Sequence, residues 1–411
     1  MISIAILGYG TVGSGVVEVL EKNRDSINKK AGEDILIKYI LDLKDFPGTP
    51  IENIITHNFD VILNDEDVKV IAEVMGGVEP AYTFVKKALE KGKSVVTSNK
   101  ELVAKHGPEL LSIAKEKNIN FLFEASVGGG IPIIRPLNQS LTADEIYEIT
   151  GILNGTTNYI LTKMSKEGLA FDTVLKEAQE KGYAEKNPEA DVEGYDACRK
   201  IAILASLAFG MNVDYENIHT EGITKITARD MEYAKVLNRD IKLIANCIKE
   251  DNKVHAMVAP VMIDSTHPLA HVNDVYNAIF IKGNVIGEVM FYGRGAGKLP
   301  TASAVVADII DAIKHKGCNI MSFWSTKSMK FISMDQVKAK FFVVVKTDFM
   351  PAAKDSAEKI FGEIEYIILD NQEDELAFTT SEITEKAFAE KINLLNEETS
   401  IVSVQSSIRL G

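Results

Sequence analysis

The sequence has few cysteines and no long apolar run, and these absences exclude several classes of protein. Its three cysteines, Cys198, Cys247 and Cys318, lack metal-ligand spacing and cannot form a disulfide framework. No apolar stretch reaches the roughly 20 residues that a membrane-spanning helix needs. No basic segment precedes the first apolar run, so we expect no signal peptide. The net charge of −14 disfavours nucleic acid and anionic membranes as partners, and we expect a cytoplasmic protein.

The composition is that of an ordinary globular protein, with 46% hydrophobic and 25% charged residues. A chain of 411 residues is too long for one core, so we expect two or three domains. Strands are predicted at VKVIAEVMGG (68–77) and KSVVTSNK (93–100), with a helix between them at 80–92. Strands that alternate with helices indicate an α/β fold with a parallel, doubly wound sheet.

The first 20 residues carry a dinucleotide-binding pattern. A short apolar run leads to Gly8, Gly10 and Gly13, and a helical pattern follows from Thr11 and Val12. In this G-x-G-x-x-G context the first glycine permits a tight turn, the second lets the backbone approach a pyrophosphate, and the third allows close helix–strand packing. The helix N-terminus supplies partial positive charge for phosphates. A glycine-rich turn without a ligand is the alternative, which the position and the flanking elements disfavour.

Asp42 lies near the end of the second predicted strand, ILIKYILDL (35–43). An acid there can accept a hydrogen bond from the ribose 2′-hydroxyl and repels a 2′-phosphate, which favours NAD over NADP. Its distance from the glycines exceeds the usual spacing of about 20 residues, Lys44 could accommodate a phosphate, and a plain turn aspartate is about as frequent. The preference between NAD and NADP therefore stays open.

Two further stretches of the first 134 residues offer polar groups. Lys100 follows a strand at the edge where such sheets bind ligands, so we expect it at the cofactor–substrate junction, although most lysines are simply exposed. The stretch FLFEASVGGGIPI (121–133) predicts another strand, which runs through Glu124 into three successive glycines. Glu124 and freed backbone carbonyls could form an oxygen cage for a hard cation, but the residues by themselves favour a flexible hinge.

The stretch GYAEKNPEADVEGYDACRK (182–200) places carboxylates next to an apolar run, KIAILASLAFG. We expect one helix from about 191–194 to Phe209, on which Asp196 and Lys200 lie one turn apart on the same face. Such a pair is usually a surface pair worth about 0.3–0.5 kcal/mol, but the neighbouring apolar residues argue that Lys200 is partly buried and needs a partner. The segment is typical of a site that holds an ammonium group with carboxylates and donates a proton from a lysine.

Taken together, the motifs resemble those of the homoserine dehydrogenases over nearly the first 320 residues. The matching stretches occur in the same order: ILGYGTVGSGV, TSNKELVAKHG, EASVGGGIPII, GILNGTTNYIL, GYAEKNPEADVEGYDACRK and GAGKLPTASAVV. The family reduces L-aspartate 4-semialdehyde to L-homoserine with NAD(P)H, on the route to threonine, methionine and isoleucine. The resemblance implies that this small molecule is the substrate and that the chain forms a homodimer or homotetramer.

The resemblance also implies roles for individual residues. Lys200 would donate a proton to the aldehyde oxygen, and Glu185 and Asp196 would bind the amino and hydroxyl groups of the substrate. Asp191 would lie close by, with Lys100 near the nicotinamide. Further cofactor contacts would come from Gly182 and from a glycine of GRGAG (293–297), for which Gly297 is one candidate. A monovalent cation, Na⁺, would be held by Glu124 and the carbonyls of Val127, Gly129 and Ile131.

The C-terminal part predicts a separate module. After a linker at 325–337, strands and helices alternate in a β-α-β-β-α-β order over 338–411, with the second strand at EYIILDN (365–371). This order suggests a ferredoxin-like sandwich. It resembles the ACT regulatory module, but KTDFMPAAKD (346–355) lacks the Asp-x-Pro-Gly turn expected for an amino-acid effector. The predicted division is a coenzyme-binding Rossmann domain at 1–133, completed by a helix at about 301–316, a catalytic and dimerisation domain at 134–300, and this ACT-like domain.

Two other functions compete with this interpretation. Aspartate-semialdehyde dehydrogenase handles the same metabolite but needs a cysteine nucleophile beside a histidine, and none of the three cysteines has such a setting. A non-catalytic nucleotide and amino-acid sensor on a dehydrogenase fold is the alternative from another class of protein. The intact pair of Asp196 and Lys200 argues against it.

Overall fold

The computed structural model describes residues 1–321, 324–369 and 374–411, and the chain divides into two compact units. Neither unit is a continuous segment, because the chain passes between them several times. The first unit comprises Met1–Ile149, Arg199–Glu216 and Ile281–Met329, and the second comprises Thr150–Cys198, Asn217–Phe280 and Lys330–Gly411.

A six-stranded parallel sheet forms the centre of the first unit. Its strand order, β3-β2-β1-β4-β5-β6, places β1 beside β4 at the point where the order reverses. Strands such as β1 read as continuous apolar runs because both faces of a parallel sheet are covered. The strands are β1 (Ile2–Leu7), β2 (Ile35–Leu41), β3 (Ile55–Thr56), β4 (Val68–Glu73), β5 (Ser94–Thr97) and β6 (Phe121–Leu122).

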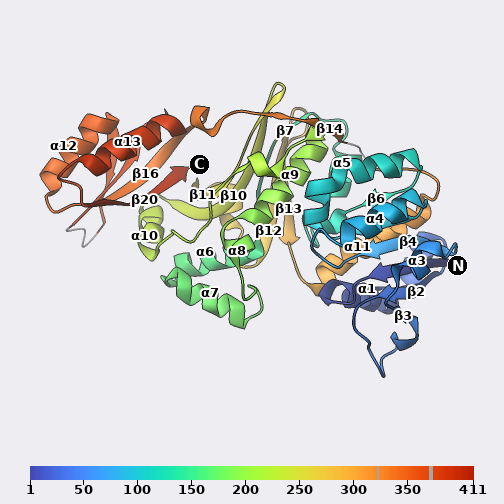
Figure 1. Ribbon diagram of the computed structural model, residues 1–411. Coiled ribbons are helices and arrows are strands. Elements are labelled where there is room, and N and C mark those ends of the chain that lie inside the picture. The colour runs from blue at the N-terminus through green and yellow to red at the C-terminus, as the bar shows by residue number, and fades with distance from the viewer. Residues whose placement is uncertain (322–323, 370–373) are drawn as a thin grey trace. The chain divides into compact units, whose positions relative to one another are not determined.

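Helices α1 and α11 pack on one part of this sheet and share its core, although they lie far apart in the sequence (Figure 1). Gly15 of α1 allows the close contact, since a Cβ there would lie 2.9 Å from the Lys298 carbonyl and 3.0 Å from the Ala302 Cβ. Ile309 and Ile313 of α11 join the same buried cluster as Ile4. The helices of this unit are α1 (Thr11–Lys22), α2 (Arg24–Ala31), α3 (Phe59–Asn64), α4 (Ala81–Glu90), α5 (Lys100–Glu116) and α11 (Lys298–Lys314).

The segment after β6 differs from the prediction. A strand was expected to run from Phe121 into the glycines, but β6 has two residues and a 3-10 helix follows at Glu124–Ser126. The physical reason is that the amide of Glu124 binds a side chain, that of Asp308, at 2.8 Å instead of a neighbouring strand. A π-helix (Pro136–Ser140) and the strands β8 (Met211–Asn212), β13 (Gly287–Arg294) and β14 (Ser325–Ser328) complete the unit.

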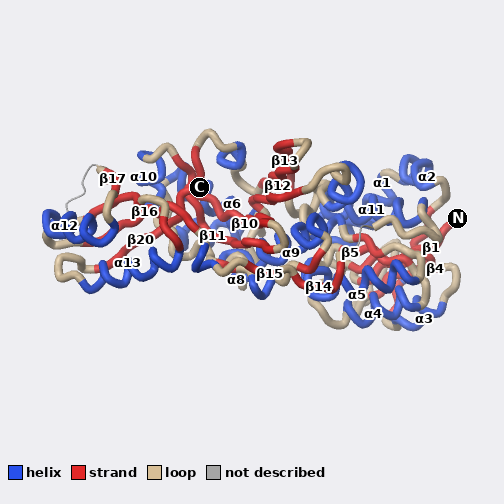
Figure 2. Tube along the Cα trace, turned by 90° about the horizontal axis from the view of Figure 1, so that it is seen from above, coloured by secondary structure: helices blue, strands red, loops and turns tan. Residues whose placement is uncertain are grey.

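A long antiparallel hairpin, β10 (Arg239–Glu250) and β11 (Lys253–Asp264), forms the centre of the second unit. Its strands run side by side in Figure 2, and β20 extends the sheet by pairing with the end of β11. Apolar residues of the hairpin strand β10 pack against helices α6 and α10. The remaining elements here are α6 (Gly155–Glu167), α7 (Phe171–Glu180), α8 (Glu189–Val192), α10 (Ala228–Val236), β9 (His219–Thr220) and β15 (Lys330–Phe331).

The chain changes from one unit to the other at five points. Four lie within elements, namely β7 (Ile146–Ile152), α9 (Tyr195–Phe209), the 3-10 helix Tyr215–Asn217 and β12 (Tyr276–Gly283), and the fifth lies between Met329 and Lys330. The single helix predicted from about 191–194 is in fact two, α8 and α9. They are separated at Gly194, whose φ of 83° lies in the left-handed region and cannot continue a helix. Asp191 and Asp196 therefore stand on different helices.

The C-terminal segment has the order β16-α12-β17-β18-β19-α13-β20, in which the two-residue strand β19 pairs with the start of β16. The other strands form antiparallel pairs in the order β20-β16-β18-β17. Helices α12 and α13 lie next to each other in Figures 1 and 2 and share an apolar cluster with the sheet. Part of the strand predicted at 365–371 lies outside the described residues. The bounds are β16 (Lys338–Lys346), α12 (Met350–Phe361), β17 (Ile364–Ile367), β18 (Glu375–Thr380), β19 (Ile383–Thr384), α13 (Glu385–Glu397) and β20 (Ser403–Leu410).

Within the described ranges, every helix is either too short or too polar to cross a bilayer.

Lys242 in β10 is a buried lysine whose titration tests this packing. Its side chain is buried, and Nζ donates to the carbonyl of Val272 at 2.7 Å and to Oδ1 of Asn273 at 3.2 Å. Burial lowers the pKa of Lys242 to about 8. Between that pH and the usual lysine pKa of about 10.4, the unfolded chain holds a proton that the folded chain has released.

The free energy of unfolding of the natural chain, compared with Lys242→Met, should therefore rise with pH across this window, by at most about 1.4 kcal/mol per pH unit. This gain in the free energy of unfolding is complete above about pH 10.4 and is lost as the pH falls through about 8. Denaturant unfolding of both proteins at pH 7, 8, 9 and 10 measures the difference. Parallel curves would show that Lys242 titrates alike in both states.

Candidate functional site

The glycine-rich loop between β1 and α1 has the conformation that a dinucleotide-binding turn requires. Gly8 has a φ of 100°, and a Cβ at Gly13 would lie 2.0 Å from the carbonyl oxygen of Gly8. Only glycine at Gly13 therefore lets α1 approach β1 so closely. A Cβ at Gly10 would meet no atom within 4 Å, so this side of the loop is open to a ligand. Thr11 and Val12 begin α1, whose first amides have no partners within the helix.

Asp42 immediately follows β2 and braces the glycine loop. Its Oδ2 accepts a hydrogen bond from the Tyr9 amide at 2.7 Å, and its Oδ1 accepts one from the Lys44 amide at 3.0 Å. Each oxygen retains a further acceptor position, so a ribose hydroxyl could still bind. The carboxylate thus has a structural partner that the sequence did not indicate.

Glu73, at the end of β4, was missed by the sequence analysis. Its buried carboxylate accepts hydrogen bonds from Oγ1 of Thr97 at 2.6 Å and from the Met75 amide at 2.8 Å. Burial raises the pKa of Glu73, and these donors oppose the shift. Asn99 caps α5 by accepting from the Leu102 amide at 3.1 Å, which fixes the start of the helix where Lys100 lies. An acid at the buried end of a largely apolar strand is the signal that could have found Glu73.

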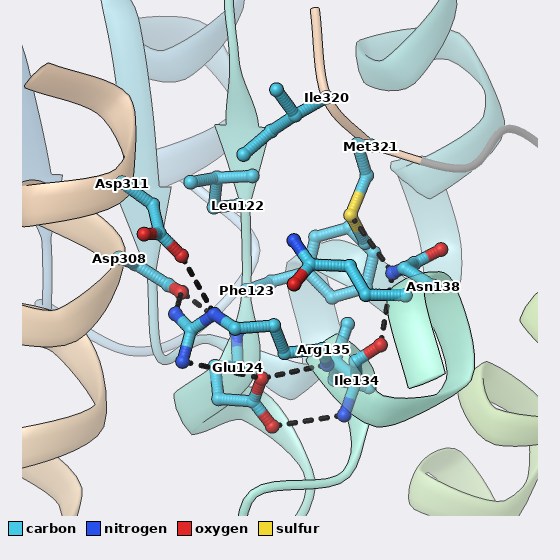
Figure 3. Close-up of a pocket in the computed structure, with 11 residues that line it drawn as sticks. Leu122, Phe123, Glu124, Ile134, Arg135, Asn138, Asp308, Asp311, Ile320 and Met321 are labelled. Carbon is cyan, nitrogen blue, oxygen red and sulfur yellow. Dashed lines mark hydrogen bonds and ion pairs between the residues drawn. The ribbon is translucent and has the colours of Figure 1, made fainter. Parts of the chain in front are cut away.

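A cluster of charged groups surrounds Glu124 (Figure 3). The guanidinium of Arg135 contacts Asp308 at 2.5 Å and Asp311 at 2.7 Å, and lies 3.9 Å from Oε2 of Glu124. Burial raises the pKa of Asp308 to about 8, and Arg135 opposes that shift. These side chains line a cavity of about 20 Å³, which is room for one water or one small ion and too little for a metabolite.

The carboxylate of Glu124 is largely occupied by backbone amides. Its Oε1 accepts from Ile133 at 2.6 Å and from Ile134 at 2.8 Å, and its Oε2 accepts from Arg135 at 2.8 Å. One acceptor position of Oε2 is left for a cation. The other predicted ligands, Val127, Gly129 and Ile131, do not line the cavity. No group of three or more His, Cys, Asp or Glu among the described residues could hold a metal.

Asn154 brings two of the predicted substrate-binding carboxylates together. Its Nδ2 donates to Oδ1 of Asp191 at 2.8 Å and to Oδ2 of Asp196 at 2.9 Å. Its own Oδ1 accepts from the Thr157 amide at 2.9 Å and caps α6. The sequence analysis quoted the stretch around Asn154 without assigning this residue a role, although N-G-T-T before a helix is an N-cap signal.

The other predicted residues of this region have different settings. Asp196 and Lys200 lie one turn apart on α9, with exposed fractions of only 4% and 8%, so Lys200 is more deeply buried than expected. Glu185 is exposed and follows Gly182, which has a φ of 73° in the turn after α7. Gly297 caps α11 with a φ of 121°. The structure thus joins Asp191 to Asp196 through Asn154 but shows no such link for Glu185.

The chemistry of this arrangement follows from its charges. Two carboxylates held by one neutral amide near the N-terminus of α6 form a negative site, which suits an ammonium group. A buried lysine on the helix of Asp196 can exchange a proton with a nearby oxygen. The glycine loop can receive a pyrophosphate at the start of α1.

Comparisons with known proteins agree on one family. The protein-family model described as "Homoserine dehydrogenase, NAD binding domain" matches residues 8–124 of this chain. The family model described as "Homoserine dehydrogenase" matches residues 132–310. The homoserine dehydrogenase of Bacillus subtilis is 46% identical over 319 residues, 76% of this chain and 73% of that protein. That of Helicobacter pylori is 37% identical over 100% of this chain and 99% of its own. The structure of the Thiobacillus denitrificans homoserine dehydrogenase has a TM-score of 0.92 at 34% identity, covering 100% of this chain and 98% of the other.

Arg135→Met tests whether the guanidinium holds the acidic cluster together. Above about pH 8, where buried Asp308 is ionised, the substitution leaves it and its acidic neighbours without their cation, so the free energy of unfolding should fall by about 3–5 kcal/mol. Lys298→Met is the matched control, because its pair with Glu18 is exposed on both sides and should be worth no more than about 1 kcal/mol. Denaturant unfolding measures both losses, and equal losses would show that Arg135 has only the value of a surface ion pair.

Proposed function

This chain belongs to the homoserine dehydrogenase family of NAD(P)-dependent oxidoreductases, and we propose that Lys200 is the proton donor of its reaction. The reaction interconverts L-aspartate 4-semialdehyde and L-homoserine. The observation that carries the proposal is the placement of Lys200 one turn after Asp196, whose carboxylate shares the Asn154 amide with Asp191. A proton donor thus stands beside groups that suit the substrate's ammonium.

Each of these side chains has its own role in the reaction. The coenzyme, when bound, supplies or accepts the hydride. In reduction, the ammonium of Lys200 neutralises the negative charge that grows on the carbonyl oxygen and gives that oxygen its proton. In oxidation, the neutral amine of Lys200 takes the hydroxyl proton, which requires Lys200 to be deprotonated first. Asp191 and Glu185 bind the substrate's amino group, and Asp196 orients its hydroxyl.

The first unit would hold the coenzyme. The open side of Gly10 and the close packing at Gly13 support a pyrophosphate placed at the start of α1. The free acceptor positions of Asp42 support a ribose hydroxyl there, which favours NAD. We propose the following coenzyme contacts in this unit: Gly8, Gly10, Thr11, Val12, Gly13, Asp42, Lys100 and Gly297. Gly182, a residue of the second unit, stays a proposed contact on the resemblance alone.

A monovalent cation, Na⁺ in the family pattern, fits these residues only in part. Oε2 of Glu124 keeps one acceptor position, and the carbonyls of Val127, Gly129 and Ile131 follow in the next loop. Any cation there would stabilise the loop and would take no part in the proton transfer.

We propose a division of tasks along the chain. Residues 1–133, with α11, bind the coenzyme, and residues 134–300 hold the substrate and form the dimer or tetramer. Residues 338–411 form a ferredoxin-like ACT-type module, a proposal supported by their element order and by the strand order β20-β16-β18-β17. Because 346–355 lack the turn expected for an amino-acid effector, this module serves assembly. We place the enzyme in the cytoplasm.

Absorbance at 340 nm with homoserine tests the activity directly. The chain should reduce NAD or NADP at alkaline pH in the presence of potassium or sodium ions. If Asp42 binds the ribose, kcat/KM should be higher with NAD, and a tenfold preference for NADP, about 1.4 kcal/mol, would reverse that assignment. No reduction of either coenzyme would refute the proposed activity and leave the sensor as the better interpretation.

Lys200→Ala tests the proton donor. Because general acid–base groups contribute about 10²–10⁴-fold, kcat should fall by that amount. Coenzyme affinity should hardly change, since β1 and α1 build the glycine loop. Lys200→Arg should rescue little, because arginine keeps the charge but cannot release its proton. Thermal unfolding controls for folding, and near-normal turnover in both variants would make Lys100 the leading proton donor.

A further inference from the structure

Arg409 of β20 makes a double clamp inside the second unit. Its Nη1 and Nη2 donate to the two carboxylate oxygens of Glu221, both at 2.8 Å. Its Nε and Nη2 donate to the carboxylate of Glu385, the first residue of α13, at 2.5 and 3.0 Å. Only 8% of Arg409 is exposed. Paired bonds of this kind fix the direction of a carboxylate as well as its distance.

The Glu221 carboxylate that Arg409 binds remains charged near neutral pH. Burial opposes ionisation of Glu221, but His219 and Arg409 outweigh it and lower the pKa of Glu221 to about 2. The backbone of Glu221 is held as well, because its amide donates to the carbonyl of Val258 in β11 at 2.7 Å. Residue 221 is thus fixed at both its side chain and its main chain.

The two residues after Glu221 contact α8 directly. Gly222 lies so close to α8 that a Cβ there would be 2.4 Å from the carbonyl oxygen of Val192. The amide of Ile223 then donates to that same carbonyl oxygen at 2.8 Å. The last residue of α8 is therefore tied directly to the segment that Arg409 clamps.

Val192 directly follows Asp191, which is one of the two carboxylates on the Asn154 amide. Helix α8 has only four residues, so it has little hydrogen bonding of its own to keep its place. Its position depends on external contacts, and the Ile223–Val192 bond is one of them. A shift of Glu221 would thus displace Asp191 relative to Asn154 and Asp196.

We propose that Arg409 is a positioning residue for substrate binding, which acts on Asp191 through Glu221 and the Gly222–Ile223 contact with α8. This inference rests on the proposed function, in which Asp191 binds the substrate's amino group. The C-terminal strand β20 thus affects the substrate site without contacting the substrate. Since Asp191 binds ground state and transition state alike, loss of its position raises the KM for homoserine and leaves kcat nearly unchanged.

Steady-state kinetics of the full chain test this assignment. Arg409→Lys keeps the charge but cannot bind two carboxylates in paired fashion, and Glu221→Gln removes the charge it binds. Each should raise the KM for homoserine by about tenfold, about 1.4 kcal/mol, with the coenzyme KM and kcat within about twofold. The double variant should show no more than the larger single effect, because either substitution alone breaks the same contact.

Arg229→Lys is the matched control. Arg229 of α10 also reaches into the C-terminal segment, through Glu375 at 3.0 Å, and it pairs with Glu232 at 2.7 Å, but neither contact leads to α8. Its kinetic constants should equal those of the natural chain. Thermal unfolding of every variant separates a local shift from a general loss of stability.

The outcomes distinguish this inference from the function on which it rests. An unmodified chain that does not oxidise homoserine would refute the proposed function, and this inference with it. An active Arg409→Lys or Glu221→Gln enzyme with an unchanged homoserine KM would overturn the positioning role alone. The same would follow if Arg229→Lys raised that KM equally, or if the two single effects added in the double variant.

Discussion

The amide of Asn154 is the interaction on which the proposed substrate site depends. Two carboxylates in one place repel each other, and bare carboxylates in a buried setting are costly. One side-chain nitrogen donates to both Asp191 and Asp196, while the oxygen of the same side chain caps α6. The amide thus fixes two carboxylates without adding a positive charge, and this arrangement suits an ammonium group. Helices α6, α8 and α9 all meet at this one residue.

The local features of this protein could be predicted from its sequence. The glycine spacing and the apolar strands predicted the parallel sheet and the loop before α1, and both are present. The spacing of Asp196 and Lys200 predicted their shared turn on α9, since helical periodicity is set by near neighbours. The break at Gly194 was missed because glycine is tolerated inside helices as well as at their ends.

Contacts between distant residues were beyond sequence reasoning. Glu124 and Asp308 are 184 residues apart, and Arg409 and Glu221 are 188 apart. No local pattern marks such partners, because each looks like an ordinary charged residue in its own segment. The cation cage at Glu124 stays a prediction, and the protein partners of this carboxylate show the difficulty. The residue types suited a cation, yet three backbone amides take most of the carboxylate's acceptor positions. Residue chemistry suggests what a group can bind, and the fold decides what it does bind.

The packing of α11 against α1 has a consequence for how the protein is made. The apolar face that includes Ile4 and Val16 is completed by residues of α11, which begins at Lys298. A ribosome that adds about 5–20 residues per second needs roughly 10–40 s to pass from the end of the first sheet to the end of α11. During that time the sheet stands with one face uncovered beside a growing chain. The nascent protein is therefore exposed to aggregation for nearly half of its synthesis, and a chaperone that shields this face until α11 emerges would raise the yield of folded protein.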